Sequence, residues 1–139
     1  MTRITRLGPL MALACAAASF PAAAAEPPGK TAVIAEVDRL RPRMSDVNQA
    51  IWRFAEPGLE ERRSSRELMD WLRENGFSVR ADVAGMPTAF VASYGRGEPV
   101  IAYLAEYDAL IGVSQKAVPR REARDDPAIV AGHGCGHSV

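Results

Sequence analysis

The residues best suited to chemistry form one short segment, Gly132-His133-Gly134-Cys135-Gly136-His137. It contains both histidines of the sequence and one of its two cysteines. Thiolate and imidazole groups are ligands for zinc and similar metals, and the alternating glycines permit the backbone angles of a tight metal loop. On extended or looped backbone the side chains of Cys135 and His137, two residues apart, converge on one side. The segment therefore favours a metal site.

Two other interpretations of this segment stay open. A Cys–His nucleophilic pair needs the imidazole beside the thiol, and a spacing of two residues is a poor arrangement for that. A structural glycine-rich loop needs no ligand at all. A self-sufficient zinc knuckle is disfavoured, because no second Cys/His pair stands at finger spacing.

Two carboxylates, Glu106 and Asp108, directly follow the apolar run 100–105. Such an unbroken run is typical of a strand buried on both faces of an α/β sheet, and open α/β sheets place their chemistry at the carboxyl ends of strands. Two residues apart on extended chain, both side chains point to the same side. They are candidate site residues, and the alternative is that backbone donors satisfy them at the end of the strand.

Helices are predicted upstream of this region. Apolar residues spaced alternately by four and three predict a helix over 33–54, with a kink or break at Pro42. Its apolar stripe is expected to pack on this protein's own sheet, with subunit contact as the alternative. A second helix is predicted after Glu60 and Glu61, ending at a glycine cap, Gly76.

Strand patterns follow the second helix. Alternating apolar residues predict a half-buried strand over 77–83, and β-prone residues predict another over 88–94. With the run 100–105, this makes three candidate strands. The segment 114–127, half of whose residues are charged, is predicted to be a solvated loop.

The 139 residues allow one ordinary domain, preceded by a targeting segment. Residues 1–25 combine two early arginines, an uncharged apolar stretch and a small-residue end at Ala23-Ala24-Ala25, which is typical of a cleaved secretory signal peptide. The stretch is too short to span a bilayer. The sequence therefore predicts a periplasmic or secreted protein, with 26–139 as its mature domain and no membrane partner after cleavage.

Charge and cysteine content restrict the partners further. Seventeen basic and seventeen acidic residues leave no excess positive charge, so nucleic acid is not an expected partner. After cleavage Cys135 is the one remaining cysteine, so it cannot form an internal disulfide in an oxidising compartment.

The two motifs together resemble a known family. The segment Ala105-Glu106-Tyr107-Asp108-Ala109-Leu110 followed by 132–137 is similar to the M20 metallopeptidase/amidohydrolase family, and weaker upstream matches extend the resemblance over residues 31–139. The resemblance implies an α/β fold, namely the N-terminal part of a zinc-peptidase-like α/β/α sandwich, incomplete in this sequence. It also implies a two-metal centre holding zinc or manganese.

Roles for individual residues follow from the resemblance. Cys135 and His137 match family metal ligands, and Asp108 matches an aspartate that orients the site from behind the ligands. The roles of Glu106 and His133 stay open, with His133 a further candidate ligand. Ser138 departs from the family pattern, which has Asn or Asp after the second histidine, and this puts the local hydrogen bonding around the metal in question.

The implied activity is metal-dependent hydrolysis of an amide bond in an N-acyl or aminobenzoyl amino acid, so the expected partner is a small amide or dipeptide-like substrate. The family's general base, its other ligands and its oligomerisation domain match nothing before Val139. The sequence therefore predicts an N-terminal fragment, inactive alone, that forms homo- or hetero-oligomers through the missing part. The alternatives are a non-catalytic binding or regulatory remnant and the product of a truncated gene.

Overall fold

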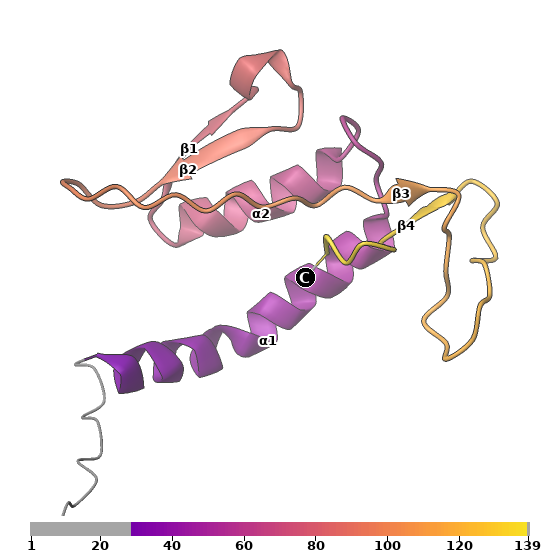
Figure 1. Ribbon diagram of the computed structural model, residues 1–139, viewed down its shortest axis with the longest axis horizontal. Helices are drawn as coiled ribbons and strands as arrows, with labels where there is room; N and C mark the ends of the chain where they lie inside the picture. Colours follow the sequence, from indigo (N-terminus) through magenta and orange to yellow (C-terminus); the bar gives the residue numbers. More distant parts are fainter. Residues whose placement is uncertain (1–28, 139) are drawn as a thin grey trace, which may run out of the picture.

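The structure is a computed structural model that describes residues 29–138, so the predicted signal peptide lies outside the described residues. The described part contains two long helices, a β-hairpin and a second small sheet (Figure 1). The elements, in chain order, are α1 (Lys30–Phe54), α2 (Arg62–Glu74), β1 (Ser78–Ala81), the 3-10 turn η1 (Val83–Gly85), β2 (Phe90–Ser93), β3 (Leu110–Ile111) and β4 (Ala131–Gly132). None of the helices in this part is long and apolar enough to cross a membrane.

Helix α1 continues through Pro42 without a break. Proline removes only one backbone donor, and Pro42 lies on an exposed stretch where water reaches the carbonyl that loses it. Figure 1 shows the helix axis changing direction along its length, as the predicted kink requires. Only the C-terminal half is covered, with Val47 and Ile51 buried. Val33 and Val37 are exposed, so packing of the whole stripe on a sheet is not observed.

Helix α2 begins and ends where the sequence predicted. At its C-terminal end Gly76 has a φ of 84°. The backbone N–H groups of Gly76 and Phe77 donate to the carbonyls of Arg73 and Leu72, which is the Schellman arrangement that glycine favours. This end of the helix is therefore determined by residues next to it in the chain.

The strand predictions for 77–83 and 88–94 are confirmed in shortened form. Strands β1 and β2 pair antiparallel, with Ser78 opposite Ser93 and Ala81 opposite Phe90. The η1 turn joins them, and the hairpin lies against α2 (Figure 1). The ring centroids of Phe77 and Tyr94, which flank the two strands, are 5.1 Å apart.

The prediction of a buried central strand over 100–105 is wrong for this structure. The segment crosses the molecule as irregular chain (Figure 1). Val100, Tyr103 and Leu104 are 75%, 94% and 97% exposed. A strand is buried on both faces only when neighbouring strands pair with it and helices cover it, and none of the described residues forms a backbone hydrogen bond with this segment. The observed fold is thus a mixed α/β arrangement with two small antiparallel sheets.

The charged segment 114–127 is irregular, as predicted, and salt bridges within it satisfy much of its charge. Lys116 pairs with Glu122 at 2.8 Å and with Asp125 at 2.6 Å. The side chain of Arg124 instead extends from the loop to α1. Its guanidinium lies 4.3 Å from the centroid of the Trp52 ring and donates to the Trp52 carbonyl. The contact between Arg124 and Trp52 attaches the loop to the end of α1. The partial burial of the guanidinium lowers the pKa of Arg124.

Candidate metal centre

Three chain segments meet at the C-terminal end of α1 and bring the two sequence motifs together. Strand β3 pairs antiparallel with β4, placing Leu110 opposite Gly132. The Ala109 amide donates to the Glu56 carbonyl at 2.8 Å, within a parallel bridge between Pro57 and Ala109. The contact between the segments is a cluster of buried alanines, Ala55, Ala109 and Ala131. Small side chains allow the backbones to approach this closely, so the end of 106–108 and the start of 133–137 become neighbours.

His137 lies between the two predicted carboxylates. Its Nδ1 donates to Asp108 Oδ1 at 2.7 Å, and its Nε2 stands 3.1 Å from Glu106 Oε2. The hydrogen bond with Asp108 is the main cause that raises the pKa of His137. The structure thus brings together Glu106, Asp108 and His137, which the sequence singled out from two motifs 29 residues apart.

Two atoms of this cluster stand at a separation that two ligands of one divalent metal also have. Each ligand atom lies about 2.1 Å from a bound zinc, so two ligands of one ion stand about 3 Å apart. The Nε2 atom of His137 and Oε2 of Glu106 meet this condition at 3.1 Å. A carboxylate on the opposite ring nitrogen, the place of Asp108, is the usual partner of a ligating histidine, because it fixes the tautomer and the ring orientation. A hollow of about 500 Å³ opens beside Glu106 and His137.

Cys135 and His133 do not join this pair. Cys135 is a free, exposed thiol. Within residues 29–138 no three His, Cys, Asp or Glu side chains are grouped closely enough to hold one ion. The described residues therefore bring together two donors, from Glu106 and His137, and the exposed Cys135 thiol is not grouped with them.

His133 points toward α1. Its Nε2 donates to the carbonyl oxygen of Ile51 at 3.0 Å. Its Nδ1 is buried and has no hydrogen-bond partner among the described residues. Burial is the main cause that lowers the pKa of His133, which favours a neutral ring that donates through Nε2.

Asn48 is a site residue that the sequence analysis missed. From the same face of α1, its Nδ2 donates to the carbonyl of Ser138 at 2.8 Å. Ser138 is buried, and its backbone makes this contact, so the departure from the family's Asn or Asp at this position does not disturb it. A lone asparagine inside a helix gives no sequence signal for a partner 90 residues away.

Tyr107 was also missed, because it separates two more conspicuous carboxylates. Its hydroxyl donates to the Thr88 carbonyl, and its ring stacks on Phe90 with centroids 5.9 Å apart. Burial, with the nearby charge of Glu61, raises the pKa of Tyr107 to about 12. The tyrosine thus ties the motif to the hairpin, while its two neighbours reach His137.

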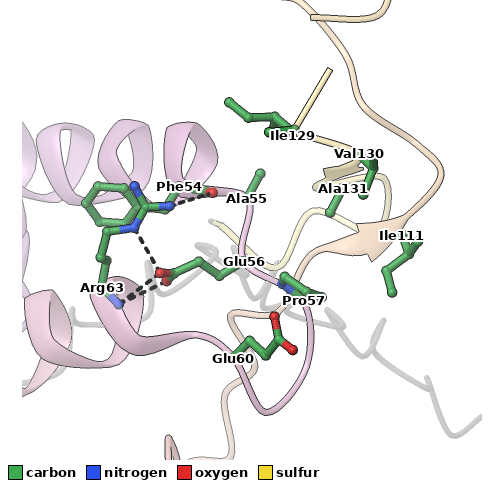
Figure 2. A pocket seen from close by; sticks show the side chains of 11 residues that line it. Phe54, Ala55, Glu56, Pro57, Glu60, Arg63, Ile111, Ile129, Val130 and Ala131 are labelled. Carbon is green, nitrogen blue, oxygen red and sulfur yellow. Dashed lines mark hydrogen bonds and ion pairs between the residues drawn. The ribbon is translucent and has the colours of Figure 1, made fainter. Parts of the chain in front are cut away.

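Glu56 stabilises the junction from which the site is built (Figure 2). Its carboxylate accepts hydrogen bonds from the Arg63 and Ser64 amides, from the Ser64 hydroxyl and from Arg63 Nε, at 2.9–3.1 Å. The two amides belong to the first turn of α2, where the N-cap residue, Glu61, makes no side-chain cap. Burial opposes ionisation of Glu56, but these bonds outweigh it and lower its pKa.

The cavity of about 490 Å³ beside Glu56 is separate from the candidate metal centre. Figure 2 shows its lining, contributed by the end of α1, the following turn and strands β3 and β4. None of the predicted site residues lines it.

Comparison with known proteins yields one informative relative. No family model matches the chain. The chain is 43% identical over 99 residues to a subunit of the p-aminobenzoyl-glutamate hydrolase of Escherichia coli (strain K12). The aligned stretch is 71% of this chain and 20% of the relative, so the chain spans about a fifth of that protein's length.

An identity of 43% over 71% of the chain is well beyond chance resemblance. The relative is a hydrolase by name. The resemblance predicted from the sequence is thereby confirmed: over most of its length this chain is similar to a p-aminobenzoyl-glutamate hydrolase, an amidohydrolase of the M20 family.

Proposed function

We propose that this chain contributes part of the metal centre of a metal-dependent amidohydrolase that cleaves an amide bond of an N-acyl or aminobenzoyl amino acid. The observation that carries the proposal is His137, held by Asp108 on one nitrogen and facing Glu106 with the other. The similarity to a hydrolase of aminobenzoyl-glutamate by name supports the substrate class. The two small sheets and the exposed apolar segment 100–105 are compatible with part of an α/β/α sandwich.

In this proposal His137 and Cys135 hold the metal, and Glu106 is a third candidate ligand. When bound, divalent zinc or manganese, as one ion or as a pair, polarises the amide carbonyl and lowers the pKa of water. Asp108 keeps the proton of His137 on Nδ1, which leaves Nε2 as the ligand atom. Tyr107 holds the backbone between the two carboxylates through its bond to Thr88.

A second candidate function is a non-catalytic binding or regulatory role that retains metal affinity. It is favoured by the incomplete ligand set, since residues 29–138 group fewer than three metal-binding side chains.

Hydrolysis also needs an open metal position and a placed base. We therefore expect the 139-residue chain alone not to hydrolyse p-aminobenzoyl-glutamate, and a partner protein or a second copy to complete an active centre.

A chimera tests the catalytic proposal. Residues 31–139 of this chain would replace their counterparts in the E. coli relative, and hydrolysis of p-aminobenzoyl-glutamate would be measured with added zinc or manganese. We expect the chimera to retain turnover and its His137→Ala version to lose it, because the imidazole is a metal ligand in this proposal. A soluble, folded chimera with no activity contradicts the catalytic role and favours the second candidate.

Export is proposed as well, on the signal-peptide pattern of residues 1–25. Expression of the full chain in a bacterium is expected to give a periplasmic or secreted product whose N-terminal sequence begins Glu-Pro-Pro, because cleavage follows the small residues at Ala25. Edman sequencing of the fractionated cells measures this. A product that starts at Met1 and stays in the cytoplasm excludes the proposal.

A further inference from the structure

We propose that His133 and Asn48 are positioning residues that clamp the loop carrying Cys135 and His137 onto helix α1, and that neither of them binds the metal. The clamp rests on the proposed function for its purpose, since it holds a loop of candidate ligands. Its geometry is independent of any metal.

The clamp consists of two hydrogen bonds at the two ends of one loop. His133 Nε2 donates to the Ile51 carbonyl at 3.0 Å, and Asn48 Nδ2 donates to the Ser138 carbonyl at 2.8 Å. Asn48 and Ile51 lie about one turn apart on α1, and the Ile51 carbonyl also accepts the Ala55 amide at 3.1 Å, so His133 shares this acceptor with the end of the helix. Both ends of the loop, residues 133 and 138, are thereby attached to α1. The two candidate ligands, Cys135 and His137, lie between these attachment points.

The composition of the loop explains why it needs fixing at both ends. Gly134 and Gly136 alternate with the ligand residues, and Gly136 has a φ of 82°. Glycine loses more conformational entropy on ordering than any other residue. A free loop of this kind would lose that entropy when the metal binds, and this would weaken binding. A loop that is already ordered before binding would not lose it. Each clamp bond is therefore expected to increase metal affinity without touching the ion.

The surroundings of His133 set it apart from the candidate ligands. Its Nε2 is committed to a helix carbonyl, and its Nδ1 is covered by protein. Cys135 and Glu106, in contrast, are exposed, and Glu106 lines the hollow at His137. An ion entering from that hollow reaches His137 Nε2 without displacing His133 from the helix.

Four variants of the full chain test the clamp. His133→Ala removes the donor, whereas His133→Gln keeps an N–H donor near the place of Nε2 but is a poor metal ligand. Asn48→Ala removes the second bond. Asp46→Ala is the matched control, because it truncates an exposed polar side chain two positions from Asn48 on α1. Cobalt affinity is read from the thiolate-to-cobalt absorption band. The ring nitrogens are followed by long-range 1H–15N correlation, which is simple to assign with two histidines in the chain.

We expect His133→Ala and Asn48→Ala to weaken cobalt binding about tenfold, as loss of an outer partner does, and His133→Gln and Asp46→Ala to stay near wild type. Zinc should shift the ring nitrogens of His137 and leave those of His133 in the Nε2–H tautomer. A zinc-induced shift on His133 Nδ1, or His133→Gln binding as weakly as His133→Ala, overturns the clamp.

Amide hydrogen exchange separates failure of the clamp from failure of the metal centre. If the wild-type chain shows neither a cobalt band nor a shift on His137, the proposed metal centre is contradicted. The clamp is then judged on metal-free chain. Protection of the amides of Gly134 and Gly136 that is lost in His133→Ala and retained in His133→Gln supports it. Equal protection in wild type and His133→Ala overturns it.

Discussion

Replacing His137 with alanine, or Cys135 with serine, is expected to abolish the zinc binding of the full chain. Alanine removes the proposed ligand atom, which stands 3.1 Å from Glu106. Serine replaces a soft thiolate with a hydroxyl, which is a much poorer ligand for zinc. The losses should exceed the roughly 10–100-fold that removal of an outer partner costs. Competition against a chromophoric chelator measures the affinity, and elemental analysis measures the metal content.

Asp108→Asn provides the graded comparison. Asparagine keeps the shape of aspartate, but it can turn its NH2 group, which is a donor, toward His137 Nδ1. We therefore expect zinc affinity to fall by about 10–100-fold, a smaller loss than removal of a ligand causes. Asp46→Asn is the matched control, since Asp46 is an exposed aspartate on α1. Undiminished zinc content in both His137→Ala and Cys135→Ser would exclude the proposed ligands. An Asp108→Asn variant equal to Asp46→Asn would exclude the orienting role of Asp108.

Replacing Glu56 with glutamine is expected to lower the free energy of unfolding by about 2–3 kcal/mol, the usual cost of losing hydrogen bonds to a charged group. The carboxylate caps the first turn of α2, where a negative charge is favoured. It also bonds to Arg63 Nε at 2.9 Å and to the buried hydroxyl of Ser64. Arg63 is 62% exposed, so most of the loss should come from the two amides and the hydroxyl. Urea denaturation at neutral pH measures it, with the exposed Glu60→Gln as the matched control.

The same carboxylate gives the stability a pH dependence. The pKa of Glu56 is lower in the folded chain than its usual value. Its contribution is therefore fully present above the unfolded pKa, near 4.3, and is lost as the pH falls through the folded pKa. The difference in free energy of unfolding between wild type and Glu56→Gln should therefore disappear in this acidic pH range, whereas Glu60→Gln should follow wild type. A constant difference between wild type and Glu56→Gln down to the lowest pH would contradict a charged Glu56 as the cap.

The sequence by itself determined the elements whose hydrogen bonds are local. Helix α2 and its Gly76 end depend on residues within one or two turns of each other. The β1–β2 hairpin depends on two adjacent patterns joined by a short turn. The two motifs around His137 were recognisable because unusual residue types cluster at short spacing, and the similarity to an M20 amidohydrolase confirmed that recognition.

Only the tertiary structure decided which groups meet. The bonds from His133 to Ile51 and from Asn48 to Ser138 join residues 82 and 90 positions apart, and no local pattern encodes such a pairing. The apolar run 100–105 was predicted as a buried strand, but burial requires partners on both edges and both faces. The described residues provide none, so Leu104 remains 97% exposed. Apolar composition states what a segment can bury, whereas the rest of the fold decides whether it is buried.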